Sequence, residues 1–220
     1  MNDKRETSRA AIYSLVLIMI PWITHLINYL FSLNLQRFGL IPLDWIGLRG
    51  ILTLPFLHDS WDHLMSNTPS LFLLMFGLFL FYKRDAWKIL LYLYLISGLL
   101  TWFMGRHHSI HIGASGLVYA LAAFHFVSGI MKKVPQQLAF ALLVAFLYGG
   151  FIWAFFPSLY QHTSISWEGH LSGLLTGVAL AVYFRRLGPE PPVYTFMEED
   201  ENEDEDAYWN IPGQNDPDNE

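Results

Sequence analysis

The chain has 220 residues, of which 53% are hydrophobic and only 15% are charged. Soluble domains carry about 25% charged residues, so this composition favours a membrane protein. The net charge of −6 arises at the carboxyl end, since twelve of the nineteen acidic residues lie from Glu190 onward. The absence of cysteine excludes disulfides, thiolate catalysis and cysteine-bound metals. No basic stripe lies on a soluble face, so we expect no nucleic-acid partner.

Six segments are long and apolar enough to cross a membrane. In chain order they are residues 11–31, 63–82, 86–104, 113–131, 136–156 and 168–186. No small-residue cleavage site follows the first segment, so we interpret it as a retained span and not as a signal peptide. The sequence therefore predicts an all-α, polytopic membrane protein built as a bundle of six transmembrane helices.

The basic residues indicate how these spans are oriented. With six spans, ten of the thirteen Lys and Arg residues lie on one side of the membrane, and only Arg37, Arg49 and Arg106 lie on the other. Cytoplasmic loops carry an excess of Lys and Arg, so both termini are predicted to be cytoplasmic. A short chain of this kind suits the plasma membrane of a bacterium.

We divide the chain into a cytoplasmic amino terminus (1–10), a six-helix domain (11–187) and an acidic cytoplasmic tail (188–220). The run EEDENEDED at 198–206 repels itself, which predicts disorder in the tail. The external loop 32–62 is rich in apolar and aromatic residues. We expect it to fold onto the membrane surface as short helices, with Trp45 and Trp61 at the level of the headgroups.

Several polar residues lie inside the spans, where polar groups are costly and commonly functional. A helix rises about 1.5 Å per residue. Counting back from the cytoplasmic basic residues therefore puts Ser115, His170 and Asn67 at a similar depth, somewhat below the outer boundary of the membrane. His63 lies one turn higher, at the outer surface. Three helices thus bring polar side chains to one level.

Ser115 and His170 have the chemistry of a nucleophile and its base, because a serine hydroxyl reacts only after a base takes its proton. Small residues on both helices would let them approach closely. These residues are Gly173 and Gly177 beside His170, and Gly116, Ala120 and Ala123 after Ser115. Tyr119 is one turn from Ser115 and can hold the imidazole by stacking. Glu168 points elsewhere on its helix, which favours a dyad over a triad.

Acyl transfer also needs hydrogen-bond donors for the developing oxyanion. The side chains of His63 and Asn67 are one helical turn apart and can point together. The backbone N–H of Ser115, at a helix amino terminus, adds a third donor. Gly113 and Gly116 would let the backbone bend and a substrate approach.

These residues resemble the motifs of the rhomboid family of intramembrane serine proteases. GASGLVYAL at 113–121 is similar to the family's Gly-x-Ser-Gly motif with a Tyr one turn later. GHLSGLLTG at 169–177 matches its His-x-x-Gly-x-x-x-Gly motif, and HLMSN at 63–67 is similar to its His-x-x-x-Asn motif. The three motifs occur in the family's order, and the resemblance covers about residues 10–187.

The resemblance implies the six-helix fold and an endopeptidase that cleaves membrane-anchored proteins near a transmembrane segment. It implies that Ser115 is the nucleophile, His170 the base, and His63 and Asn67 the oxyanion donors. The partners it implies are transmembrane protein substrates and membrane lipids.

Two positions depart from the family pattern. Many members carry an adjacent Trp-Arg pair in the first external loop, whereas Trp45 and Arg49 are separated here. The residue before His170 is Gly169, where Ala is frequent in the family. This second change is small, and we expect activity to be kept.

His107, His108 and His111 lie just before the nucleophile motif and could suggest a metal site. Metal sites usually need three or four ordered ligands, and a protease of this type needs neither a metal nor another cofactor. We interpret the three histidines as part of a polar external loop that dips toward the site.

Two other functions are compatible with parts of the pattern. A rhomboid-like protein without catalytic activity would bind transmembrane segments, but it would not need both Ser115 and His170. A small transporter or proton channel would use His25, His63 and His170. The polar residues cluster at one depth and do not line a full path, which argues against the channel.

Overall fold

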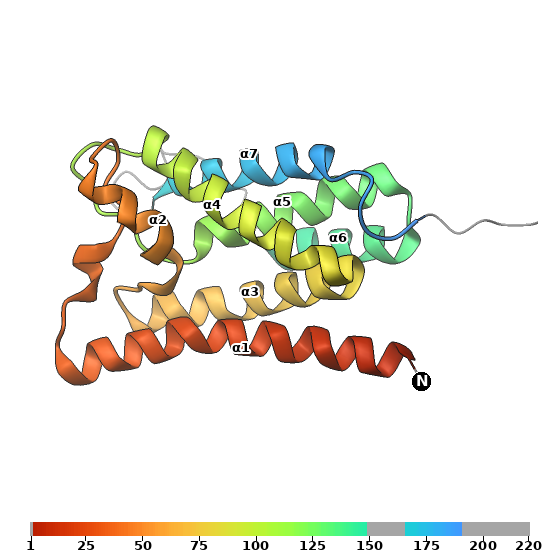
Figure 1. Ribbon diagram of the computed structural model, residues 1–220, viewed down its shortest axis with the longest axis horizontal. Coiled ribbons are helices and arrows are strands. Elements are labelled where there is room, and N and C mark those ends of the chain that lie inside the picture. Colours follow the sequence, from red (N-terminus) through yellow and green to blue (C-terminus); the bar gives the residue numbers. More distant parts are fainter. Residues whose placement is uncertain (1, 149–165, 191–220) are drawn as a thin grey trace, which may run out of the picture.

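The computed structural model describes residues 2–148 and 166–190, which form a bundle of helices (Figure 1). The long helices are α1 (Asn2–Phe31), α3 (Trp61–Tyr82), α4 (Ala86–Met104), α5 (Ser115–Lys132), α6 (Pro135–Tyr148) and α7 (Trp167–Tyr183). The short ones are η1 (Leu35–Phe38), η2 (Ile46–Arg49), α2 (Gly50–Thr53), η3 (Leu54–Phe56) and η4 (Lys83–Asp85). Within these residues there is no strand, only an isolated antiparallel bridge between Leu40 and His111. The all-α prediction is therefore confirmed.

Each of the six predicted spans overlaps one of the long helices. Three helical stretches of the described residues are long and apolar enough to cross a membrane: Lys4–Phe31, Trp61–Met104 and Ser115–Lys132. The second is 44 residues long because it contains both α3 and α4, joined by η4. Predicted residues 149–156 of the fifth span lie outside the described part of the chain, as does the tail beyond residue 190.

The first helix begins earlier than the predicted span 11–31, at Asn2. Its polar amino-terminal turns are held by contacts that the apolar pattern does not encode. The Glu6 carboxylate forms a 2.9 Å ion pair with Lys83 in η4, and the Ser8 hydroxyl donates to the carbonyl of Lys4 at 2.8 Å. The ion pair ties the amino end of α1 to the turn between α3 and α4.

The core of the bundle is apolar and lies where α3, α4, α5 and α7 meet. Its fully buried side chains include Leu74, Leu78, Ile89, Leu93, Leu121 and Phe124. Many large apolar side chains face outward instead, such as Leu15, Val16, Ile23, Phe103 and Phe146. An exposed apolar surface of this extent marks contact with lipid or with another protein, which agrees with the membrane-spanning helices.

Basic residues gather at the end of the bundle that carries the amino terminus. The turn from α3 to α4 contains Lys83 and Arg84, and it lies at this end together with the carboxyl ends of α5 and α7 (Figure 1). There the Lys132 ammonium donates to the carbonyl of Arg185 at 3.0 Å. The loop of residues 32–60, which includes α2, lies at the opposite end.

The loop of residues 32–60 folds into the predicted short helices and presents an apolar surface. Leu43, Ile46 and Leu52 are exposed, and Trp45 is 81% exposed with its ring 5.9 Å from that of Trp102. The Trp61 ring, at the start of α3, packs next to His25 of α1, with the two ring centres 4.5 Å apart. The level of Trp45 and Trp61 relative to the headgroups stays a prediction.

The separated Trp45 and Arg49 are held by contacts of their own. The Arg49 guanidinium lies 4.9 Å from the centre of the Phe38 ring and donates to the carbonyl of Arg37 at 3.3 Å. The indole of Trp102 on α4 donates to the carbonyl of Asp44 at 2.9 Å. The loop is therefore fixed to itself and to α4 without an adjacent Trp-Arg pair.

Candidate active site

Ser115 and His170 project from the amino ends of two neighbouring helices. Ser115 is the first residue of α5, and Gly113 just before it has φ +105°, a conformation that favours glycine and turns the chain into the helix. At the start of α7 the Ser166 hydroxyl accepts the N–H of Gly169 at 3.1 Å and so caps the helix. These two structures bring His170 Nε2 to 3.0 Å from Ser115 Oγ.

The two helices pack backbone against backbone below the dyad. A Cβ atom on Gly173 would lie 2.1 Å from the carbonyl oxygen of Gly116, and one on Gly177 would lie 2.2 Å from the carbonyl oxygen of Ala120. Real Cβ atoms do not approach other atoms this closely. The small residues therefore set the distance between α5 and α7, as predicted from their spacing.

The imidazole of His170 is 6% exposed and lies flat against Tyr119. The two ring centres are 4.3 Å apart, and the planes differ by 19°. Among the described residues, Nδ1 of His170 has no hydrogen-bond partner. Glu168 turns away and forms a 2.6 Å ion pair with Arg106. The described residues thus form a Ser-His dyad with no carboxylate behind the base.

His63 lies at the amino end of α3, close to the nucleophile loop. Its Nδ1 is 2.8 Å from a carboxylate oxygen of Asp59. Its Nε2 occupies the space beside Gly113, since a Cβ there would lie 2.7 Å from that nitrogen. Partial burial acts to raise the pKa of Asp59, but the hydrogen bond and charge of His63 lower it below its ordinary value. The structure thus brings this predicted oxyanion donor to the backbone two residues before Ser115.

Asn67, the other predicted side-chain donor to the oxyanion, forms hydrogen bonds within the protein. Its amide nitrogen donates to the carbonyl of His63 at 3.0 Å and contacts Nε2 of His58 at 3.3 Å. Burial, followed by the charges of His63 and His25, lowers the pKa of His58 to about 3. A neutral His58 can accept from Asn67 through Nε2. Both amide protons of Asn67 therefore have partners inside the protein.

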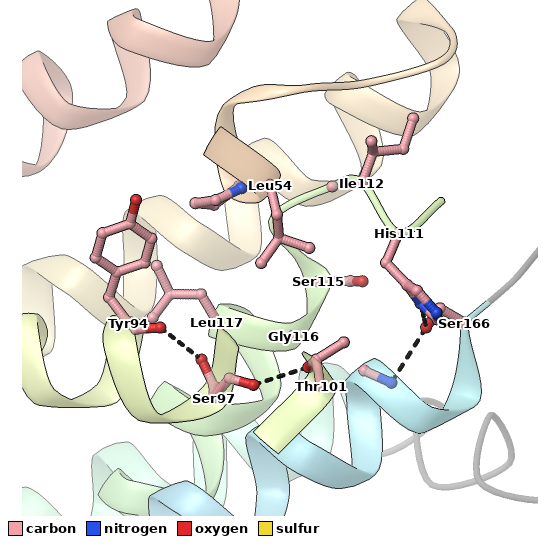
Figure 2. A pocket seen from close by; sticks show the side chains of 13 residues that line it. Leu54, Tyr94, Ser97, Thr101, His111, Ile112, Ser115, Gly116, Leu117 and Ser166 are labelled. Carbon is pink, nitrogen blue, oxygen red and sulfur yellow. Dashed lines mark hydrogen bonds between the residues drawn. The ribbon is translucent and has the colours of Figure 1, made fainter. Parts of the chain in front are cut away.

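A small cavity borders Ser115 between η3, α4, α5 and the start of α7 (Figure 2). It leaves about 20 Å³ for the centre of a water molecule, which is enough for one water. Polar groups from Ser97, Thr101 and Ser166 line one part, and Leu54, Pro55 and Leu117 line another. This space has room for a water molecule but not for a peptide.

Four residues near the site were not predicted to take part in it: His58, Arg106, His111 and Ser166. The signal for Ser166 was present, because a Ser followed by an acidic first turn is typical of a helix start. His111 was grouped with His107 and His108, but its ring nitrogens bond to Ser109 and Ser166. Within the described residues, no group of three or more His, Asp or Glu side chains could hold a metal ion.

Comparisons with known proteins agree with this architecture. A family model described as the Rhomboid domain matches residues 45–187. Uncharacterized proteins of Mycobacterium tuberculosis and Mycobacterium bovis are 36% identical to this chain over 173 residues, which are 76% of this chain and 72% of theirs. An uncharacterized protein of Mycobacterium leprae is 32% identical, over 76% of this chain and 68% of its own. With the domain match spanning most of the helical bundle and containing all three motifs, the chain belongs to the rhomboid family.

Proposed function

We propose that this protein is an intramembrane serine endopeptidase that hydrolyses peptide bonds in or near the transmembrane segments of membrane proteins. The observation that carries the proposal is the 3.0 Å contact between His170 Nε2 and Ser115 Oγ. A base in hydrogen-bond reach of a hydroxyl is the signature of an activated nucleophile. The stacked ring of Tyr119 supports it, because it fixes the plane of the imidazole.

The reaction begins when Ser115 Oγ attacks the carbonyl carbon of the scissile peptide and its proton passes to Nε2 of His170. The carbonyl oxygen becomes an oxyanion. His170 then gives the proton to the leaving nitrogen, the C–N bond breaks, and an ester to Ser115 remains. His170 next takes a proton from a water molecule, and the water oxygen attacks the ester carbon. The C–O bond to Ser115 then breaks, His170 returns the proton to Ser115 Oγ, and the new carboxyl group leaves. This sequence needs no metal or other cofactor.

The oxyanion donors belong to this proposal as well. The N–H of Ser115 lies in the first turn of α5, where helical N–H groups have no intrahelical acceptor. His63 provides a second donor through Nε2; because its Nδ1 proton bonds to Asp59, Nε2 carries a proton only in the imidazolium form. Asn67 provides a third donor after its bond to His58 or to the carbonyl of His63 is exchanged for one to the substrate.

The rival function is a catalytically inactive homologue that binds transmembrane segments without cleaving them. Such a protein has no need of a histidine bonded to a serine and stacked on a tyrosine inside the bundle. The observed dyad therefore favours the protease. Under either function, the partners are transmembrane proteins and membrane lipids, with no nucleic acid.

The proposed location is the plasma membrane of a bacterium, with both termini in the cytoplasm. The end of the bundle that holds Lys83, Arg84 and Lys132 is then the cytoplasmic end, in keeping with the positive-inside rule. The proposed division into an amino terminus (1–10), a six-helix domain (11–187) and an acidic tail (188–220) follows the same orientation. A reporter fused after residue 220 should be active only if it functions in the cytoplasm.

Labelling of the purified full chain in detergent with a fluorophosphonate probe tests the proposed chemistry. The wild type should be labelled, whereas Ser115→Ala and His170→Ala should not. Ser128→Ala is the matched control, because Ser128 is a buried serine on the same helix, and it should be labelled like the wild type. Absence of labelling in a folded wild type, or labelling that survives Ser115→Ala, would contradict the proposal.

A further inference from the structure

His111 is a buried histidine that the proposed mechanism does not use. It is 3% exposed, although its loop neighbours His107 and His108 are exposed. Its backbone forms two hydrogen bonds with Leu40 in the first external loop, at 2.8 and 2.9 Å. Its ring lies against the start of α7, with Nδ1 2.6 Å from Ser166 Oγ (Figure 2).

The hydrogen bonds around this ring have one consistent direction. The Ser109 hydroxyl donates its proton to the carbonyl of Arg106 at 2.6 Å, so it must accept from Nε2 of His111 at 2.8 Å. A neutral imidazole with its proton on Nε2 accepts at Nδ1. The Ser166 hydroxyl therefore donates to His111. Burial, followed by the charge of Arg106, lowers the pKa of His111 to about 4, which agrees with a neutral ring.

Ser166 holds the base and the residue before it. Its hydroxyl oxygen accepts the N–H of Gly169 at 3.1 Å, and its carbonyl oxygen accepts the N–H of His170 itself at 3.3 Å. The proton on this hydroxyl is directed to His111. The orientation of the Ser166 hydroxyl, which caps α7, therefore depends on the His111 ring. His111 lies in the loop before α5, four residues from Ser115.

A second link joins the same two segments. Glu168, in the first turn of α7, is 2% exposed and forms a 2.6 Å ion pair with Arg106 at the start of the loop. An acidic side chain in this turn also interacts favourably with the helix dipole. The loop that leads to the nucleophile thus holds the first turn of α7 at two points.

We propose that His111 and Ser166 are positioning residues that fix the first turn of α7 and thereby hold His170 at bonding distance from Ser115. The inference rests on the proposed function, because it assigns a role in activating Ser115. It predicts that loss of the His111–Ser166 bond slows the chemical step and leaves substrate binding unchanged. A residue that served stability alone would lower the melting temperature without this selective loss.

Two substitutions at His111 separate the two bonds of the ring. The amide oxygen of His111→Asn can take the place of Nδ1 and keep the bond to Ser166. The longer amide of His111→Gln reaches the place of Nε2 and keeps only the bond to Ser109. We expect His111→Gln to lower the rate of fluorophosphonate labelling and kcat by about tenfold or more at an unchanged KM, because small displacements of reacting groups are costly. His111→Asn should restore most of that loss.

The measurements use the full chain in detergent, well below the melting temperature of each variant. His107→Gln is the matched control, since His107 is exposed in the same loop, and it should be labelled like the wild type. If His111→Gln fails to fold, the pair Ser166→Ala and Ser166→Thr gives the same test, since only Thr keeps the hydroxyl.

The outcomes distinguish the two proposals. A folded wild type that is not labelled would overturn the proposed function and this inference with it. A labelled wild type with equal rates for His111→Gln and His111→Asn would overturn the inference alone. Slow labelling of His111→Gln that is rescued in His111→Asn, or of Ser166→Ala that is rescued in Ser166→Thr, would support both.

Discussion

The two halves of the candidate site are built in different ways. The half formed by α5 and α7 is set by backbone contacts, since Gly173 and Gly116 leave no space between the helices. The half at the amino end of α3 is set by side-chain hydrogen bonds that link Asp59, His63, Asn67 and His58. The first half is assembled before a substrate arrives, whereas the second has partners that a substrate must displace.

This contrast teaches that nucleophile activation and oxyanion stabilisation can respond separately to mutation. Backbone contacts tolerate no added atoms, because neither partner can move aside without moving a helix. Side-chain hydrogen bonds can be exchanged for others at small cost, since their net contribution is about 0.5–1.5 kcal/mol each. Substitutions in the two halves should therefore differ in both size and kind of effect.

The largest effect is expected from Gly173→Ala. Its Cβ would lie 2.1 Å from the carbonyl oxygen of Gly116, so α5 and α7 must separate and the dyad must open. Activity should fall by about 100-fold or more, and overpacking should cost about 1–3 kcal/mol of stability. Leu175→Ala on the exposed face of α7 is the control for both fluorophosphonate labelling and thermal unfolding. If Gly173→Ala were labelled at the normal rate, the α5–α7 half would tolerate an added atom, and the distinction between the two halves would be wrong.

Asn67→Ala should have the next largest effect, through kcat. Removal of one oxyanion donor costs about 10²–10³-fold in kcat. Because Asn67 must first give up a bond to His58 or His63, we expect the lower part of that range. Steady-state cleavage of a transmembrane substrate measures this loss of kcat. Ser66→Ala, at the neighbouring position, is the control. An unchanged kcat would remove Asn67 from the proposed mechanism.

Acid should weaken the side-chain hydrogen bonds around the site, including the bond of His111 to Ser166, before it weakens the backbone contacts between α5 and α7. The pKa values of His58 and His111 are lowered from 6.5 to about 3 and about 4 by burial, followed by neighbouring charges. Between 6.5 and these values the unfolded chain binds protons that the folded chain does not, so the free energy of unfolding falls as the pH falls. Melting temperatures should decline from about pH 6.5 downward. The decline should be shallower in His111→Asn, and a flat profile would contradict the burial of neutral histidines.

Gly169→Ala should have the smallest effect. Its Cβ would lie 3.0 Å from Ser166 Oγ, a contact that a shift of a few tenths of an ångström relieves. We expect labelling within about threefold of the wild type, since the neighbour is a side-chain atom and not backbone. A loss as large as that of Gly173→Ala would mean that the start of α7 is as constrained as its middle.

Much of the architecture could be predicted from local sequence patterns. Apolar runs between basic turns place α3 and α4 correctly, and the spacing of Gly173 and Gly177 predicts the close approach of α7 to α5. The polar turns of α1 that begin at Asn2 precede the apolar run and were not part of the predicted span, and their Glu6 pairs with Lys83 in η4, which lies far along the chain.

Side-chain partners within the site were harder to predict. The bond between His111 and Ser166 joins residues 55 positions apart, and no periodicity encodes such a contact. The engagement of Asn67 by His58 depends on how the loop folds back before α3. Spacing along a helix shows which residues share a face, but it does not show which neighbours already occupy their donors.

The contact between Gly173 and Gly116 also limits how this protein can diverge. The obstacle to a side chain at Gly173 is a carbonyl oxygen of the main chain, so no second substitution at a facing residue can make room for it. In most packed cores a larger side chain can be accommodated when a facing side chain becomes smaller. That kind of paired substitution is not possible at this contact. Variation that retunes the protein for new substrates must accumulate elsewhere, in the external loops and on the surfaces that face lipid.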